Sequence, residues 1–478
     1  MNKTKFKIHQ SSSPRLPWCI LGLFMLVVLL PQQLPAANPG KLNFYITTDF
    51  LYQYNKLSES ENQFYESLSL FANYHQWSLG TTLRGNNFFK QTPNDTFADP
   101  QFDVYRKYIR YNSKNLEVTA GDFYALLGRG LVLSVLKNED VLRERTILGG
   151  DIHYNKGGLD WRALGGRIKD ETREEEWTVA GTEVTLEYTK NHRAGVHFSY
   201  IDDVNTLSSL GKRYTYSVSL QGTKLFKNFS YYSEVAGLDY RGIHKDSGYG
   251  IFSNLTYNKS HITCFLEFKH YKDFNNEMNN PPAADREDDE ASSINDTTGL
   301  RLYFQYAFFD PDIILFVTFG RYKEFFDTGN HIYAGIEIED LMERLNLSLS
   351  YGIKDIHYPI KRLDGHLLYQ FSDRWSSEIS IKDKRYKDGS FTFNEQDHTF
   401  QVSYSPSISL FFMHQYSHNR VIDLNHFYSG GIKIYFSGGT VIELSGGTIR
   451  GGQICSGGQC FVAPPFKGIK CSILHTFK

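Results

Sequence analysis

The chain has 478 residues, of which 41% are hydrophobic and 15% are aromatic, and its formal net charge at pH 7 is −2. The mean hydropathy of −0.41 argues against a bundle of membrane-spanning helices, because each such helix needs about 20 mostly apolar residues. The nearly neutral charge gives no reason to expect nucleic acid as a partner.

A single long apolar run lies near the N-terminus. Residues 18–30 (WCILGLFMLVVLL) follow a basic segment and precede Leu-Pro-Ala-Ala. This order predicts a cleaved signal peptide, which we place at residues 1–37, with cleavage after Ala36 or Ala37. The alternative is an N-terminal anchor helix, although the run is short for a membrane crossing.

From residue 42 onward, apolar and polar residues alternate along segments of roughly ten positions. In the first segment Phe44 and Ile46 share one parity, and Asn43 and Thr47 share the other. A period of two predicts a β-strand with one apolar and one polar face. Repeated behind an export signal, it predicts an all-β fold: one large antiparallel transmembrane β-barrel, residues 38–478, with about 24 strands (about 22–26). The segment 101–111 is ambiguous, since both parities mix aromatic and basic residues.

The connections between these segments alternate between short and long. Short connections such as Asn155-Lys156-Gly157-Gly158 and Ser405-Pro406-Ser407 have the composition of hairpin turns. Long polar connections such as 86–100, 274–297 and 446–466 lie between them. Outer-membrane barrels have short periplasmic turns and long extracellular loops. The alternation therefore predicts an outer-membrane location, an even strand number and periplasmic termini.

Charged residues should avoid the lipid-facing parity, because Arg or Lys there costs about 2–4 kcal/mol at the membrane midplane. The outward parity includes Val196, Phe198, Leu302 and Leu349. The inward parity is mixed in sign, which predicts no strong preference for anions or cations. Its candidate lumen residues are Arg84, Glu117, Arg162, Glu187, Glu267, Arg301, Glu337, Glu378, Lys433 and Glu443.

The stretch 121–133 (GDFYALLGRGLVL) breaks the alternation and is too apolar for an exposed loop. We expect residues 122–144 to fold inward as a constriction, as loops do in porins. Asp122, Arg129 and Lys137 are the candidate constriction residues. The alternatives are an extended hairpin tip and a helical cap above the rim. The short Gly-Arg-Gly motif lacks the strand–helix context of a phosphate-binding loop.

Cys455 and Cys460 enclose Ser-Gly-Gly-Gln in the last long connection. Two close cysteines in an exported chain predict a local disulfide that stiffens the loop tip. A metal site is the alternative. Cys264 and Cys471 have outward parity, and we expect them to face lipid as small apolar residues.

Weaker clusters leave several interpretations open. His414, His418 and His426 surround one connection and could hold a metal, but spaced histidines in a Tyr-rich segment are more often surface residues. The run 285–290 (DREDDE) could bind Ca²⁺ or bridge lipopolysaccharide phosphates, or form a solvated loop. No Ser–His–acid arrangement stands out, so we expect neither an enzyme nor a bound cofactor or metal.

The last segment places Ile469, Cys471, Ile473 and Phe477 on one parity. It resembles the terminal-strand signal read by the barrel-assembly machinery, although the final residue is Lys478 rather than Phe. We therefore expect that machinery to act on the chain during biogenesis.

Three motifs resemble an uncharacterised family of large outer-membrane barrels from Bacteroidetes-type Gram-negative bacteria. They are Gly-Asp-Phe at 121–123, the run 128–133, and GGQICSGGQC at 451–460. The resemblance implies a fold and a location but no activity and no functional residue.

A barrel of about 24 strands encloses a lumen wider than that of a simple porin, so something should narrow it. The leading hypothesis is a pore or transport conduit, narrowed near residues 122–144. The alternative is a non-conducting barrel that scaffolds a surface or secretion complex. The expected partners are outer-membrane lipid, lipopolysaccharide and, for the scaffold, a lipoprotein or periplasmic protein.

Overall fold

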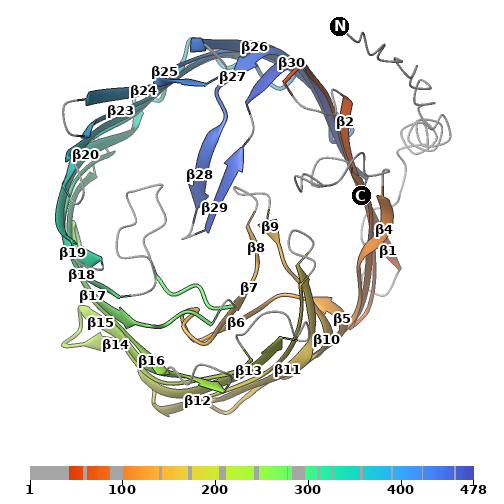
Figure 1. Ribbon diagram of the computed structural model, residues 1–478, viewed down its shortest axis with the longest axis vertical. Helices are drawn as coiled ribbons and strands as arrows, with labels where there is room; N and C mark the ends of the chain where they lie inside the picture. The colour runs from red at the N-terminus through yellow and green to blue at the C-terminus, as the bar shows by residue number, and fades with distance from the viewer. Residues whose placement is uncertain are drawn as a thin grey trace, which may run out of the picture.

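The computed structural model describes most of the chain after the expected signal peptide (Figure 1). The peptide itself, residues 1–37, lies outside the described residues, which are 42–57, 62–86, 101–138, 143–170, 175–203, 211–241, 247–276, 278–282, 296–309, 312–324, 327–355, 359–388, 391–421, 424–456, 459–463 and 465–477.

One antiparallel sheet of 24 strands forms the wall of the molecule. Its alternating sequence suits the sheet, because successive side chains of a strand point to opposite faces. The wall strands are β1 (Asn43–Asn55), β2 (Asn62–Tyr74), β3 (Trp77–Asn86), β4 (Gln101–Asn112), β5 (Leu116–Phe123), β10 (Ile147–Lys156), β11 (Leu159–Asp170), β12 (Glu175–Thr189), β13 (His192–Asp203), β14 (Lys212–Leu225), β15 (Phe229–Arg241), β16 (Ser247–Lys259), β17 (Ile262–Lys272), β18 (Thr297–Phe309), β19 (Asp312–Glu324), β20 (Asp327–Leu341), β21 (Leu345–Asp355), β22 (Pro359–Gln370), β23 (Trp375–Asp388), β24 (Phe391–Tyr404), β25 (Ile408–Val421), β26 (Leu424–Phe436), β27 (Thr440–Ile449) and β30 (Phe466–Phe477).

The sheet closes on itself, because β1 pairs with β30 as well as with β2. Phe477 lies opposite Ile46, so the last strand is joined to the first. Closure leaves no sheet edge exposed to unwanted strand pairing. The predicted single antiparallel barrel of about 24 strands is therefore confirmed.

Six short strands do not belong to the wall. In Figure 1 they lie within the outline of the ring, entering from β5 and β10 on one side and from β27 and β30 on the other. They pair as three hairpins, formed by β6 (Ala125–Leu127) with β7 (Leu133–Val135), β8 (Lys137–Asn138) with β9 (Arg143–Glu144), and β28 (Gly452–Ser456) with β29 (Gln459–Ala463).

The two faces of the wall differ as the alternation predicts. On β18, the outward-facing Leu302 is 45% exposed, whereas the neighbouring Arg301 is 6% exposed. On β13, Val196 is 58% exposed and Ser199 is fully buried. The outer face is thus an apolar belt, and the inner face carries the polar side chains.

A β-bulge explains the mixed parity of segment 101–111. In the β3–β4 register, Thr82 lies opposite Arg106 and Leu83 opposite Val104, so Tyr105 is the extra residue. A bulge reverses the parity of the strand beyond it. Val104 and Ile109 are consequently both exposed on the outer face, although their positions differ in parity.

Because neighbouring strands run in opposite directions, all the short turns lie at one end of the barrel and all the long connections at the other. We call these the short-turn end and the long-connection end. The turn between β10 and β11 contains Gly157 and Gly158 with φ of 63° and 84°, the left-handed conformation of a tight hairpin. β1 begins and β30 ends at the short-turn end. Among the described residues, no helix has the length and apolar character needed to cross a membrane.

Candidate functional site in the barrel lumen

The segment 124–146 leaves the wall between two paired strands. Phe123 at the end of β5 lies opposite Ile147 at the start of β10, so the wall is continuous without the residues between them. The described residues of this segment instead include the β6–β7 and β8–β9 hairpins, which lie inside the ring (Figure 1). The described part of this segment therefore lies in the lumen and is not part of the wall.

Apolar packing holds the β6–β7 hairpin against the inner face of the wall. Ala125, Leu127 and Leu133 are almost completely buried. They belong to one hydrophobic cluster with hairpin, wall and neighbouring residues Phe123, Val132, Val135, Ile147, Leu164, Ile168, Trp177, Val179, Ile201 and Met278. Fully burying a Leu or Val side chain stabilises by about 1.5–3 kcal/mol. The inner wall is apolar where the hairpin covers it.

A second segment, residues 273–282 after β17, packs against the same hairpin. Ser134 N donates to Met278 O (2.6 Å), and Asn280 N donates to Gly130 O (2.9 Å). The Asn276 amide donates to Val132 O (3.0 Å). A further hydrophobic cluster joins this segment and the hairpin to the wall, through Leu131, Tyr232, Ala236, Leu238, Phe252, Tyr271 and Phe274.

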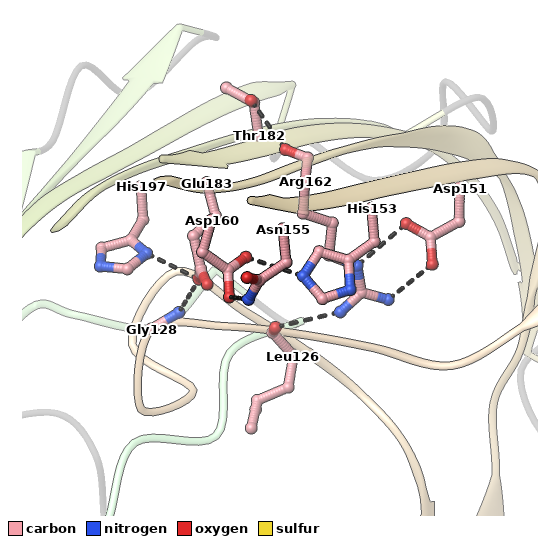
Figure 2. A network of polar contacts seen from close by, with 10 residues as sticks. All are labelled: Leu126, Gly128, Asp151, His153, Asn155, Asp160, Arg162, Thr182, Glu183 and His197. Atoms are coloured by element: carbon pink, nitrogen blue, oxygen red, sulfur yellow. Dashed lines mark hydrogen bonds and ion pairs between the residues drawn. The ribbon is translucent and has the colours of Figure 1, made fainter. Parts of the chain in front are cut away.

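Arg162 on β11 fixes the entry of the hairpin (Figure 2). Its guanidinium forms a two-point ion pair with Asp151, with both distances 2.9 Å. The same guanidinium donates to the backbone carbonyls of Tyr124 (3.0 Å) and Leu126 (3.5 Å). A bidentate carboxylate pair orients the planar guanidinium, so Asp151 positions Arg162 for these two carbonyls.

Glu183 and Glu234 accept hydrogen bonds from the turn of the hairpin. Glu183 Oε2 accepts from Gly128 N (3.0 Å) and also pairs with His197 Nδ1 (2.8 Å; Figure 2). Glu234 Oε2 accepts from Arg129 N (3.0 Å). Hydrogen bonds to an ionised acceptor are about twice as strong as neutral ones. The two carboxylates thus satisfy turn amides that would otherwise be buried without partners.

The turn needs glycine at two positions. Gly128 and Gly130 have φ of 61° and 83°, a region that L-residues enter at a cost of about 1–2 kcal/mol. A Cβ on Gly128 would lie 2.3 Å from Glu234 Oε1, and one on Gly130 would lie 2.5 Å from Asn280 O. The close approach of turn, wall and segment 273–282 depends on these glycines.

The candidate constriction residues are placed differently from one another. Asp122 accepts from Lys107 N (2.8 Å) and from the Thr146 hydroxyl (3.3 Å), so it joins the strands where the segment departs. The Arg129 guanidinium lies 4.6 Å from the centre of the Tyr232 ring, against the wall. Lys137 lies in β8, and its side chain is outside the described part of the structure.

Most candidate lumen residues lie beside an opposite charge on the inner wall. In two ion pairs both partners are candidates, Glu267 with Arg301 and Lys433 with Glu443. Four further candidates pair with residues outside the set: Glu117, Arg162, Glu187 and Glu378. The shortest nitrogen–oxygen distances are 3.3 Å for Arg110–Glu117, 2.9 Å for Arg162–Asp151, 3.4 Å for Arg193–Glu187, 3.5 Å for Arg301–Glu267, 3.0 Å for His366–Glu378 and 3.4 Å for Lys433–Glu443.

Two candidate lumen residues have other surroundings. The Arg84 guanidinium lies 3.2 Å from the centre of the Tyr105 ring. Glu337 lines a cavity of about 460 Å³ together with Glu339, Asp340 and His366. The cavity is open and acidic, and it lies where β20 and β21 approach the short-turn end.

The β28–β29 hairpin is fixed at its base. Arg450 forms ion pairs with Glu395 (2.7 Å) and Asp397 (3.7 Å) on β24. On the other side of the hairpin, the Asn55 amide donates to Pro465 O (3.2 Å). The register places Cys455 directly opposite Cys460. Residues paired in this way have Cα atoms about 4.5–5.5 Å apart, within the range of a disulfide. The disulfide itself stays a prediction.

The three histidines near the end of the chain do not gather at one point. His414 Nε2 and His426 Nδ1 are 3.1 Å apart, whereas His418 packs its ring against Phe393. Within the described ranges, no group of three or more His, Cys, Asp and Glu side chains has the arrangement of a metal site. The acidic run 285–290 lies outside those ranges.

Sequence patterns did not identify Glu183, Glu234 and segment 273–282 as parts of the site. Glu183 has the same parity on β12 as the candidate Glu187, but no local signal indicates that it accepts a hydrogen bond from the hairpin turn. The segment 273–282 is rich in Asn and Pro and has the composition of a surface loop. Phe274 and Met278 were its only apolar signals.

Solved structures with a similar fold are barrels of low sequence identity. A chain of the E. coli P pilus tip assembly intermediate PapC-PapD-PapK-PapG aligns over 94% of this chain and 62% of its own, at 9% identity and a TM-score of 0.54. The copper transporter OprC aligns over 92% and 81%, at 12% identity and a TM-score of 0.49. The P pilus usher PapC translocation pore aligns over 91% and 99%, at 8% identity and a TM-score of 0.46.

These identities indicate likeness of fold alone. The sequence matches no curated protein. A family model described as a family of unknown function (DUF6029) matches residues 19–310 and 323–477. The match covers most of the chain, as the predicted resemblance to an uncharacterised family requires, and the chain belongs to the DUF6029 family.

Proposed function

We propose that the chain is an outer-membrane β-barrel that acts as a pore or transport conduit and is narrowed by the hairpin segment 124–146. The observation that carries the proposal is the closed 24-stranded ring with a segment docked along its inner wall. A wall of this strand number leaves an aqueous lumen unless something fills it.

The outer face supports a membrane location. Large apolar side chains such as Val196, Leu302 and Leu349 are exposed around the ring. Soluble proteins rarely expose a continuous apolar surface of this extent, whereas barrels in a bilayer need one. Within the proposal, the short turns lie in the periplasm, residues 1–37 are the cleaved signal, and the source is a Gram-negative bacterium of Bacteroidetes type.

The packing of the segment supports a permanent constriction rather than a mobile gate. Leu127, Val132 and Leu133 are fully buried, and the turn amides are held by Glu183 and Glu234. A segment that opened readily would have few buried apolar contacts. The β6–β7 hairpin is therefore expected to stay docked on the inner wall.

The second candidate function is a non-conducting scaffold for a surface or secretion complex. The β28–β29 hairpin favours it, because this element also lies within the ring outline (Figure 1) and is fixed at both sides of its base. Two docked elements could leave too little room for solutes. A lipoprotein or periplasmic partner would then bind at the rim.

Single-channel conductance of the purified, refolded protein in a planar bilayer separates the two functions. Folding is first verified by heat-modifiable migration on a gel. Steady current steps support the conduit. A correctly folded barrel that stays silent contradicts the conduit and favours the scaffold, which co-purification of a lipoprotein or periplasmic subunit would then support.

A further inference from the structure

The outer face of β19–β23 changes character along its height. Near the short-turn end it is apolar, with Leu315 on β19 and Leu347 on β21. Near the long-connection end, exposed cations replace the apolar side chains, and the outward acids there are Asp355 and Asp383. The cations are Arg321 and Lys323 on β19, Lys361 on β22, and Arg385 and Lys387 on β23.

The opposite end of the same strands has the opposite charge. Its exposed cations are Arg344 and Arg374. Among the described residues, exposed acids outnumber them: Asp340, Glu343 and Asp373 lie at or next to the turns, and Asp312 and Glu339 pair with each other on the inward parity of β19 and β20. Cations therefore gather on the outer face at the long-connection end, whereas the short-turn end carries more acids.

Lys361 and Arg385 lie directly opposite each other in the β22–β23 register. Directly paired residues of neighbouring strands point to the same face with Cβ atoms about 4.5–5.5 Å apart, and like charges there destabilise the sheet. Among the residues that the structure describes, neither side chain forms an ion pair or a hydrogen bond with another side chain. Asp383, the acid nearest along the strand, is engaged by His398 Nε2 at 2.8 Å.

An anion bound between the two cations would turn this repulsion into attraction. Ile353 lies opposite Lys361 in the β21–β22 register, and the next outward residues toward the short-turn end are Leu363 on β22 and Asp383, then Ile381, on β23. The pair is therefore at the upper edge of the apolar belt, which is the height of lipid head groups around a barrel. A head group can therefore meet the cations while its acyl chains cover the belt. Each such cation near a membrane surface contributes about 1 kcal/mol toward an anionic lipid, or about fivefold in affinity.

We infer that the outer face of β22 and β23 binds the phosphorylated head group of a membrane lipid between Lys361 and Arg385. The inference rests on the proposed membrane insertion. It also orients the barrel, because the long-connection end then lies in the leaflet that carries phosphorylated glycolipid. Arg321 and Lys323 on β19 are further outward cations at this end, separated from the pair by β20 and β21.

The test is a titration of folded protein in neutral detergent with fluorescent lipid A and with dephosphorylated lipid A, which has the same acyl chains. The native protein should prefer the phosphorylated form. The double variant Lys361→Gln with Arg385→Gln should lose at least about tenfold in affinity for lipid A. The charge-preserving variant Lys361→Arg with Arg385→Lys should retain it.

A matched control removes two exposed cations from the short-turn end, Lys156→Gln with Lys190→Gln, and should bind lipid A as the native protein does. Unchanged lipid A binding in the Lys361 and Arg385 double Gln variant would overturn the inference, and so would equal binding of dephosphorylated lipid A. Complete displacement of lipid A by millimolar inorganic phosphate would indicate a free-anion site and overturn the lipid assignment.

Heat-modifiable migration verifies that every variant is folded. Conductance of the same preparations separates this inference from the proposed function. If the barrel conducts but does not prefer lipid A, the proposed pore function stands and the proposed lipid site is wrong. If the barrel is silent but prefers lipid A, the lipid site stands and the pore function is wrong.

Discussion

At the scale of single residues, Glu234 links the hairpin turn to the side chains of the inner wall. Its carboxylate accepts from Arg129 N (3.0 Å), from the Ser217 hydroxyl (2.6 Å) and from the Tyr232 hydroxyl (2.5 Å). The side chain is fully buried. A buried polar group left without its partner costs about 1–3 kcal/mol. Loss of this acceptor should therefore destabilise the docked conformation of the turn.

Replacement Glu234→Gln should loosen the hairpin, because an amide offers one acceptor oxygen where the carboxylate offers two. We expect amide hydrogen exchange of residues 125–135 to become about tenfold faster or more, corresponding to about 1–3 kcal/mol. Mass spectrometry of the exchanged peptide measures this. Glu378→Gln, at a half-exposed glutamate paired with His366, is the control and should leave the peptide unchanged. Equal exchange in both variants would rule out the role given to Glu234.

Gly128→Ala tests the close approach of the turn to the wall. The new Cβ would meet the Glu234 carboxylate, in addition to the cost of about 1–2 kcal/mol for a left-handed residue. Gly157→Ala is the matched control, since its φ of +63° is nearly the same and nothing lies within 4 Å of its Cβ. Exchange of residues 125–135 should accelerate only in Gly128→Ala. If Gly157→Ala accelerates it equally, the contact with Glu234 plays no part.

At the scale of elements, the alternation of apolar and polar residues predicted most of the wall strands. It failed where contacts between distant parts of the chain determine the local structure. The segment 101–111 was ambiguous because the bulge at Tyr105 reverses its parity, and nothing local in the sequence signals an unpaired residue. The inward fold of 122–144 was predicted from its apolar character. Its partner segment 273–282 was not predicted, because its contacts, which include backbone hydrogen bonds to Gly130 and Ser134, are with residues far away in the chain.

The β28–β29 hairpin carries the predicted Cys455–Cys460 disulfide. Cys264 and Cys471 are free. Under denaturing conditions, the mature protein should therefore react with a thiol reagent at two cysteines before reduction and at four after it, because a disulfide does not react. Mass spectrometry counts the modified thiols. Four reactive thiols before reduction would show that Cys455 and Cys460 are not joined by a disulfide.

At the scale of the whole molecule, paired charges on the inner wall should give a conduit of low ion selectivity. Arg162–Asp151, Arg301–Glu267 and Lys433–Glu443 place opposite charges side by side, so neither sign dominates the field in the lumen. The reversal potential in a KCl gradient should lie close to zero. A potential near the value for a purely cation-selective or anion-selective pore would show that one sign lines the narrowest part.

The ring was easier to predict from the sequence than the contents of its lumen, because parity along each strand is a local property. The inward orientation of candidates such as Glu187 and Glu337 stays a prediction. The width of the open lumen depends on how the segments 124–146 and 273–282 pack on each other and on the wall. That packing joins residues more than a hundred positions apart, such as Val132 and Asn276.

The central claim is that the docked segment narrows an open barrel. Because Phe123 and Ile147 are already paired in the wall, residues 124–146 can be replaced by an Asn-Gly turn that closes a hairpin between β5 and β10. The measurement is the single-channel conductance of this variant and of the native protein, both folded by the heat-modifiability criterion. We expect clearly larger current steps for the variant, because its lumen is wider; identical steps would contradict a narrowing role of the segment.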